Sequence, residues 1–93
     1  MKKKKPVTRS SDRAGDDYAA FVELLAIVRK EQGVTQTDLG ERIDRRQTWV
    51  AKVEAGDRRI DAVELIAVLD ALKVDVVEFF TRLRRRLRGK RRH

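Results

Sequence analysis

A short stretch in the middle of the chain carries side chains of the kinds that bind nucleic-acid bases. Arg46, Gln47 and Thr48 follow one another, and Lys52 comes four residues after Thr48. Glutamine can form two hydrogen bonds with adenine, and arginine or lysine can do the same with guanine. The methyl groups of Thr48 and Ala51 could contact a thymine methyl. These residues suit contact with duplex DNA, provided that one element presents them on a common face.

The sequence gives little support to other kinds of chemistry. The single histidine is His93, and there is no cysteine, so disulfides, thiolate zinc sites and cysteine nucleophiles are excluded. No Ser-His-Asp set and no glycine-rich phosphate loop occurs. The paired carboxylates of Asp16 and Asp17 are explained as helix caps. We therefore expect no enzyme activity, no cofactor and no metal site, and the absence of cysteine is compatible with a cytoplasmic protein.

The charge is divided unevenly along these 93 residues, which are enough for one domain. The net charge is +8, made up of +5 in residues 1–15, −5 in residues 16–81 and +8 in residues 82–93. The body of the chain is therefore acidic, and basic tails flank it. Such a body can bind a polyanion only if its positive charges gather on one face and the tails add to the attraction.

Apolar spacing and capping residues predict an all-α fold of five helices, with a body at residues 16–83 between basic tails at 1–15 and 84–93. The first helix begins at Asp16 or Asp17 and ends before Gly33. Thr35 with Asp38 opens the second helix. The third covers about residues 46–55 and ends at Gly56. Similar capping pairs open the last two helices, Asp61 with Glu64 and Asp75 with Glu78.

The second and third helices are joined by only about three residues, so they must cross closely. Gly40 supplies the small side chain that a close approach of the two helices requires. Turning the third helix by 100° per residue places Val50 and Val53 inward and Thr48 and Lys52 outward. Helices two and three therefore predict a helix-turn-helix whose outward face is free of acidic residues.

The run from Gln36 to Gly56 resembles the lambda-repressor/Cro type of helix-turn-helix, also called the xenobiotic-response-element family. Glutamine opens the run, a small residue stands fifth, apolar residues stand fourth, eighth, fifteenth and eighteenth, and Glu-x-Gly closes it. The resemblance extends over about residues 19–80. There are two departures, since Asp44 stands where glycine is usual and Arg45 where an apolar residue is usual.

This resemblance implies roles for individual residues. The third helix would enter the major groove, and Arg46, Gln47, Thr48 and Lys52 fall on base-reading positions. Arg58 and Arg59 lie in the loop that grips phosphates in such proteins. Arg29 and Glu54 match the family's structural ion pair between the first and third helices.

Two further side chains are assigned to phosphates from their positions. Gln36, at the start of the second helix, can present its side chain and backbone N–H to a phosphate, and Arg45 could join the clamp. Trp49 has two interpretations. It either packs partly buried against a neighbouring helix or donates its indole N–H to a phosphate.

The sequence thus predicts a sequence-specific, double-stranded DNA-binding transcriptional regulator, most simply a repressor that occupies a pseudo-palindromic operator. A homodimer would place two recognition helices about 34 Å apart. Its contact surface would come from Val76, Phe79, Phe80 and Leu83, unless these residues only close the core of the monomer. The alternatives are an antitoxin that also binds a toxin, and an RNA-binding or scaffold protein that acts through its arginine-rich ends.

Membrane association is the remaining possibility for the C-terminal segment. Residues 80–88 place apolar residues at 80, 83 and 87 among arginines, as in a basic amphipathic helix on anionic lipid. The apolar stripe is narrow, so we prefer a dimer-contact helix that leads into a nucleic-acid-binding tail. The four N-terminal lysines precede no apolar run, so we expect no secretory signal and no membrane partner.

Overall fold

The computed structural model describes the backbone of residues 7–91 and the side chains of residues 15–89. This part of the chain contains five helices and no strand, which confirms the predicted all-α class. The helices are α1 (Val7–Glu31), α2 (Gln36–Arg42), α3 (Gln47–Glu54), α4 (Ala62–Leu72) and α5 (Val76–Arg91). Residues 1–6 and 92–93, which belong to the predicted tails, lie outside the described residues.

The two outer helices are longer than predicted. Helix α1 begins at Val7, so Asp16 and Asp17 lie inside it and neither caps it. Pro6 directly precedes the helix, and it is the only proline in the chain, so no helix breaker of that kind follows it. Gly15 does not end the helix, because a single internal glycine costs only about 1 kcal/mol relative to alanine. The described parts of the predicted tails, residues 7–15 and 84–91, are thus helical.

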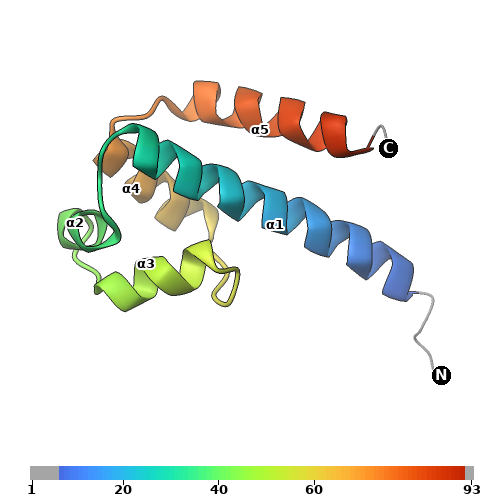
Figure 1. Ribbon diagram of the computed structural model, residues 1–93, viewed down its shortest axis with the longest axis horizontal. Coiled ribbons are helices and arrows are strands. Elements are labelled where there is room, and N and C mark those ends of the chain that lie inside the picture. The colour runs from blue at the N-terminus through green and yellow to red at the C-terminus, as the bar shows by residue number, and fades with distance from the viewer. Residues whose placement is uncertain (1–6, 92–93) are drawn as a thin grey trace.

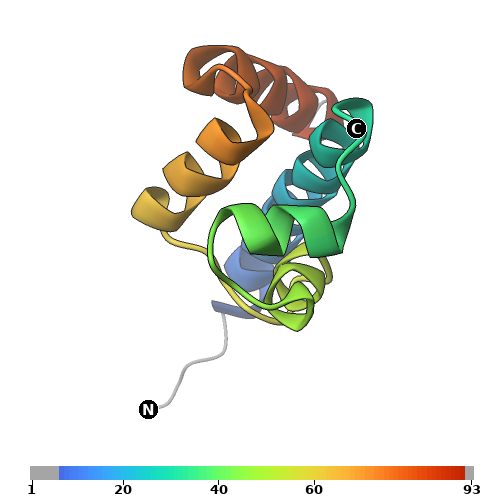
Figure 2. The ribbon, with the colours of Figure 1, turned by 90° about the vertical axis from the view of Figure 1, so that its left-hand side faces the viewer.

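Helix α1 occupies the middle of the fold, between α5 on one side and α3 on the other (Figures 1 and 2). Helices α1 and α5 run in opposite directions. Two ion pairs hold them together, between Arg82 and Glu31 at 2.8 Å and between Arg86 and Glu23 at 2.6 Å. Helices α2 and α3 stand close to each other, and α4 lies between the α2–α3 pair and α5 (Figure 2).

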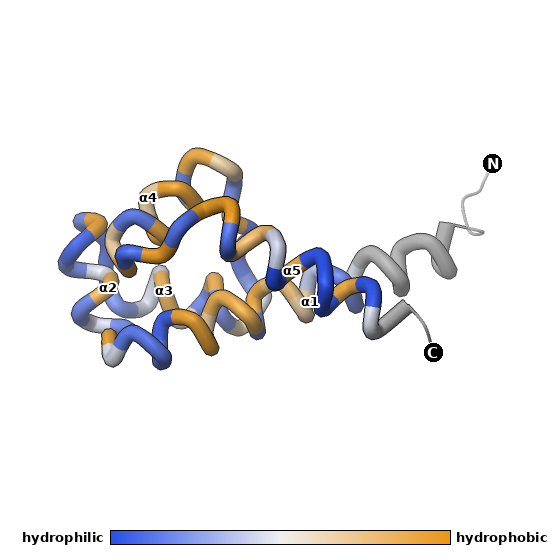
Figure 3. Tube along the Cα trace, turned by 90° about the horizontal axis from the view of Figure 1, so that it is seen from above, coloured by the Kyte–Doolittle hydropathy of each residue, from blue (hydrophilic) through white to orange (hydrophobic). Residues whose placement is uncertain are grey.

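Every helix contributes the residues of one face to the hydrophobic core. Figure 3 shows short hydrophobic and hydrophilic stretches following one another along the helices, as expected for helices that bury one face. Phe79 and Leu69 are 0% exposed. The buried cluster consists of Leu24, Leu25, Val28, Val34, Leu39, Val50, Val53, Leu65, Val68, Leu69, Leu72 and Phe79.

The residues proposed for a dimer surface divide into two groups. Phe79 is fully buried, and Val76 and Leu83 are partly buried and pack against the core. These three residues therefore close the monomer, as the second interpretation of the sequence had it. Phe80 is 45% exposed and is the one member of the predicted surface that remains open to solvent.

Hydrogen bonds at the helix starts agree with the capping pairs. Thr35 and Asp38 form a reciprocal capping box at α2, and Asp61 and Glu64 form another at α4. At α5, the carboxylate of Asp75 accepts a hydrogen bond from the backbone N–H of Glu78 at 2.9 Å. The predicted starts of these three helices are confirmed.

Candidate nucleic-acid interface

The turn between α2 and α3 depends on two residues. Asp44 adopts a left-handed backbone conformation with φ of 60°, which a short polar residue tolerates better than most. A Cβ atom on Gly40 would lie 2.6 Å from the carbonyl oxygen of Arg45. The close approach predicted for Gly40 therefore exists, and its partner is the backbone of the turn at the start of α3.

A buried ion pair joins α1 to the end of α3. The Arg29 Nε donates to one carboxylate oxygen of Glu54 at 2.6 Å, and its Nη2 donates to the other at 3.0 Å. Both side chains are only 8% exposed. Arg29 Nη1 also donates to the carbonyl of Val34 at 2.7 Å. This two-pronged contact fixes the angle of α3 against α1, because a planar guanidinium and a carboxylate meet in one orientation.

The same carboxylate anchors a chain of amides that reaches the surface. Gln36 Nε2 donates to Glu54 at 2.9 Å, and Gln36 Oε1 accepts from Gln47 Nε2 at 2.7 Å. Gln36, at the start of α2, thus orients Gln47 in the first turn of α3. One amide hydrogen and the carbonyl oxygen of Gln47 are not used in these contacts.

The outward face of α3 is accessible. Arg46, Gln47, Thr48 and Lys52 are exposed, whereas Val50 and Val53 are 1% and 2% exposed. Arg46 is the N-cap residue and makes no side-chain capping bond. Among the described residues, no carboxylate forms an ion pair with Arg46 or Lys52. The face is thus neutral to cationic, as contact with a duplex requires.

Two guanidinium groups lie close to the ring of Trp49. The Arg45 guanidinium is 4.9 Å from the centre of the indole ring, and that of Arg58 is 5.2 Å from it. Both are within range of a cation–π interaction. The indole Nε1 is buried and has no hydrogen-bond partner. This burial agrees with the interpretation of Trp49 as a partly buried residue that supports the two arginines, and its assignment to a phosphate contact stays a prediction.

Glu64 connects the same two arginines from behind. Its carboxylate accepts from Arg58 Nη1 and Nη2, both at 3.1 Å, and from Arg45 Nη2 at 3.4 Å. The hydrogen bonds from Arg58, and next the one from the Asp61 amide, lower the pKa of Glu64. In the sequence, Glu64 is already explained as a capping residue. Its spacing from Arg45 and Arg58 is not a helical repeat, so sequence reasoning missed the contact of Glu64 with these two arginines.

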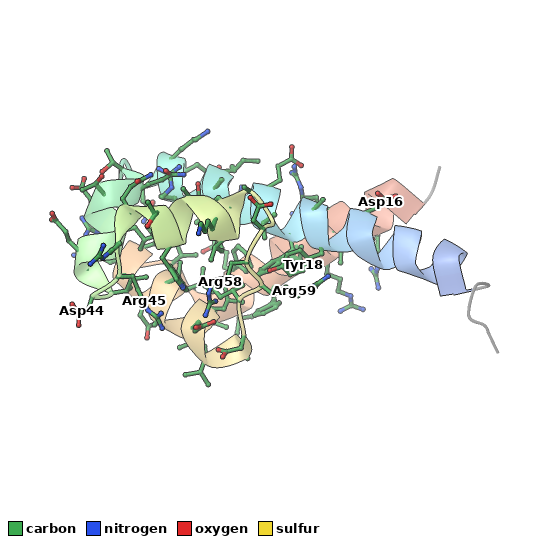
Figure 4. The ribbon with its side chains drawn as sticks, turned by 90° about the horizontal axis from the view of Figure 1, so that it is seen from below. Asp16, Tyr18, Asp44, Arg45, Arg58 and Arg59 are labelled. Atoms are coloured by element: carbon green, nitrogen blue, oxygen red, sulfur yellow. The ribbon has the colours of Figure 1, made fainter. Side chains whose placement is uncertain are left out.

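Arg59 is held against α1. Its guanidinium lies 4.1 Å from the centre of the Tyr18 ring, and the Tyr18 hydroxyl accepts a hydrogen bond from the amide of Ile60 at 3.1 Å. Figure 4 shows Arg45, Arg58 and Arg59 following one another along the side of the molecule that carries α3. The backbone amides of Asp57 and Arg58 also bind the Lys52 carbonyl, at 2.9 and 3.2 Å, which holds the loop against the end of α3.

The predicted basic residues are therefore brought together. Lys52 lies on α3, Arg46 is its N-cap residue, Arg45 lies in the turn before it, and Arg58 and Arg59 lie in the loop after it. Among the described residues, Glu64 is the one carboxylate paired with this group. The positive charge of an acidic body is thus concentrated around the exposed face of α3. No group of acidic, histidine or cysteine residues able to hold a metal occurs in the described part of the chain.

Comparison with solved structures agrees with this arrangement. The wild-type restriction-modification controller protein C.Esp1396I superposes with a TM-score of 0.72 at 24% identity, over 76% of this chain and 93% of the other. One point mutant of that protein gives 0.72 at 22% identity, over 76% and 95% of the two chains. A second mutant gives 0.69 at 25% identity, over 74% and 87%. These likenesses establish the fold.

Sequence comparison identifies the family. No curated protein sequence matches the chain. Residues 20–79 match the helix-turn-helix domain family, and this segment contains α2, α3 and the ion pair between Arg29 and Glu54. The chain belongs to the helix-turn-helix domain family, with the lambda-repressor-like arrangement that the run from Gln36 to Gly56 predicted.

Proposed function

We propose that the protein is a sequence-specific regulator of transcription that binds double-stranded DNA through α3 and represses by occupying its operator. One observation carries the proposal. Exposed side chains suited to base contacts stand on a helix whose angle is fixed from behind by the buried pair of Arg29 and Glu54. A rigid support of this kind is needed because hydrogen bonds to bases tolerate little displacement.

Gln47 is the residue that we assign most specifically. Gln36 already takes one of its amide hydrogens. The remaining N–H and Oε1 match adenine, whose N7 accepts and whose N6 amino group donates. Arg46 and Lys52 are donors suited to guanine, and the Thr48 methyl suits thymine.

Phosphate contacts would frame these base contacts. Gln36, Arg45, Arg58 and Arg59 lie around α3, and the three arginines carry positive charge at the rim of the recognition face. Arg45 and Arg58 are already held in place by Trp49 and Glu64, so little side-chain freedom would be lost when they bind. These contacts would fix the register of α3 without reading sequence.

A homodimer would bring two copies of α3 to successive major grooves. The exposed apolar residues suggest its contact surface. Val63 and Ile66 on α4 are 77% and 47% exposed, and Val77 and Phe80 on α5 are 72% and 45% exposed. Large apolar side chains left open on neighbouring helices are candidates for an interface. We assign this set to dimerisation in place of the sequence-predicted surface, of which it keeps Phe80.

Selection of bound duplexes from a random pool tests the proposal. We expect enrichment of one sequence whose two halves are related by a two-fold axis, because a symmetric dimer reads symmetric half-sites. Absence of any enriched sequence would contradict base reading. Enrichment of an asymmetric site would retain base reading and contradict the dimer. The double substitution Ile66→Ser and Phe80→Ser should then lower operator affinity and yield a monomer by sedimentation.

A further inference from the structure

The second large group of exposed positive charges lies on the other side of the molecule from α3. Helix α5 packs on the side of α1 that faces away from α3 (Figures 1 and 2). Phe79 and Leu83 turn towards the core, and Arg84, Arg85 and Arg88 are exposed. At 100° per residue the three arginines fall within an arc of about 100° on the outer surface of α5. We refer to these three residues as the α5 arginine face.

The neighbouring arginines have a different role. Arg82 binds Glu31 through two hydrogen bonds, at 2.8 and 3.0 Å, and Arg86 binds Glu23 at 2.6 Å. These pairs attach α5 to α1. No ion pair of the described residues involves the α5 arginine face. A rigidly held helix thus presents three cations that the monomer does not use, and they continue along α5 beyond Val77 and Phe80, which we assign to the dimer contact.

We propose that the α5 arginine face is a second DNA-binding surface, which binds the phosphate backbone of a second duplex while α3 occupies its operator. The inference rests on the proposed function, because operator binding puts the protein on DNA. Because α1 lies between α3 and α5 (Figures 1 and 2), we expect these arginines to face away from the duplex held by α3. The protein would therefore bridge two DNA segments.

The chemistry of the surface favours duplex phosphates. Arg84 and Arg88 stand one helical turn apart, about 6 Å along the axis, which corresponds to roughly two base-pair steps of a duplex. Arginine forks bind phosphate oxygens, and contacts of this kind carry no sequence information. No aromatic side chain lies between the three arginines, whereas surfaces for single strands stack bases on aromatic rings.

A lipid surface suits α5 less well. An amphipathic helix binds a membrane by burying its apolar face in the lipid. Phe79 and Leu83 on α5 are already occupied, since Phe79 is 0% exposed and Leu83 packs against the core. Val77 and Phe80 stay exposed, but they are the residues assigned to the dimer contact. In the described part of the chain, no helix is long and apolar enough to cross a membrane.

The test is capture of a second duplex by the full-length protein bound to its operator. A 30-base-pair operator duplex, obtained by selection, is fixed to beads and saturated with protein. A fluorescent 200-base-pair duplex without operator sequence is then added at physiological salt. The variant carries Arg84→Gln, Arg85→Gln and Arg88→Gln, which keep long helix-forming side chains on an exposed surface. Circular dichroism and thermal unfolding check that the variant folds as the wild type does.

We expect the wild type to retain the fluorescent duplex and the triple variant to retain about ten-fold less, because up to three phosphate contacts are lost. Operator affinity of the variant should change by less than about two-fold, since charges beyond a Debye length of about 8 Å are screened. Both α3 helices of a dimer remain intact in this variant, so its loss of capture would belong to α5. Equal capture by variant and wild type would overturn the inference, as would an equal loss of operator affinity and capture.

Further experiments separate a failure of the proposed function from a failure of the α5 proposal. If the wild-type protein neither selects nor binds an operator duplex, the proposed function fails. The α5 arginine face is then tested by direct binding of the 200-base-pair duplex to the Gln47→Ala, Lys52→Ala protein with and without the triple substitution. A further loss caused by the triple substitution supports the face, and no further loss overturns it. Preferential capture of a single-stranded RNA of equal charge would also overturn the assignment to duplex DNA.

Discussion

Arg29 and Glu54 meet through two hydrogen bonds, at 2.6 and 3.0 Å, where the last turn of α1 meets the end of α3. The carboxylate of this pair continues through Gln36 to Gln47 on the exposed start of α3. A buried charge pair and a surface side chain therefore belong to one connected network. Because each member is held by the next, a change in the pair should be felt both in stability and in base contact.

Replacing Glu54 by alanine should destabilise the fold by about 3–5 kcal/mol, because the charge of Arg29 is then left buried without a partner. The matched control is Glu23→Ala, which removes a carboxylate from a contact of equal length, 2.6 Å to Arg86. The Glu23 side chain is 61% exposed against 8% for Glu54, so its loss should cost less than about 1 kcal/mol. Urea unfolding at neutral pH measures both. Similar costs for the two variants would mean that water reaches the buried pair.

Gly40→Ala should destabilise the protein by about 1–3 kcal/mol, because the added methyl group meets the turn backbone and the turn must shift. The distance from its Cβ to the Arg45 carbonyl oxygen would be 2.6 Å. Gly89→Ala is the control, since a Cβ at that helical position meets nothing within 4 Å. It should stabilise the protein by about 0.5–1 kcal/mol. The two variants should change the free energy of unfolding in opposite directions, which thermal unfolding measures. A stabilising Gly40→Ala would contradict the close approach.

The sequence predicted the features that depend on local pattern. Apolar periodicity located all five helices, and capping pairs such as Thr35 with Asp38 marked the starts of the inner ones. Gly40 was predicted from the close crossing of the two helices, and a Cβ there would meet the turn backbone. Asp44 stands where the resemblance has glycine, and it adopts a positive φ. These features could be predicted because each arises from residues a few positions apart.

Contacts between distant segments were harder to predict. The stacking of Arg45 and Arg58 on Trp49, with Glu64 behind them, joins the turn, α3, a loop and α4. No periodicity encodes such an arrangement. The sequence also did not decide which side of α5 is exposed to solvent, because the apolar residues from Val76 to Leu83 fit both a core and an interface. The predicted start of α1 was wrong because residues 1–15 were assigned to a basic tail and Asp16 or Asp17 to the N-cap.

Gln47→Ala should relax discrimination at one base position by about 1–3 kcal/mol, because it removes the side chain assigned to adenine. Gln36→Ala should give a smaller loss at the same position, since Gln36 orients Gln47 from 2.7 Å without being assigned to a base. Affinities for the operator and for single-base variants of it provide the measurement. Equal weakening on every sequence would show that Gln47 does not read a base.

Stability should fall in acid through two carboxylates. Hydrogen bonds from Arg82 lower the pKa of Glu31, and hydrogen bonds from Arg58 lower the pKa of Glu64. A folded-state pKa below the unfolded value of about 4.3 stabilises the fold above that value, and the contribution is lost as the pH falls through the folded pKa. The double variant Glu31→Gln, Glu64→Gln should therefore be less stable than wild type at pH 7 and lose less stability between about pH 5 and pH 3.

Urea midpoints at a series of pH values measure the difference. Glutamine keeps the length of each side chain and an acceptor for the α4 cap, so the comparison isolates ionisation. Parallel pH profiles for the double variant and the wild type would show that other groups account for the acid sensitivity.

Arg58→Ala should reduce the dependence of operator affinity on salt, with the slope of log affinity against log salt concentration shrinking by about one unit. Arg58 lies in the loop beside α3, on the side of the molecule that would face the operator. Arg84→Ala removes the same charge from α5, which lies on the other side of α1 from α3 (Figure 1), and should leave the slope for a short operator duplex unchanged. Sequence preference should stay the same in both variants, because a phosphate contact is common to all sequences. An Arg58→Ala protein with the wild-type slope would remove that residue from the phosphate clamp, and a reduced slope in Arg84→Ala would place α5 against the operator duplex.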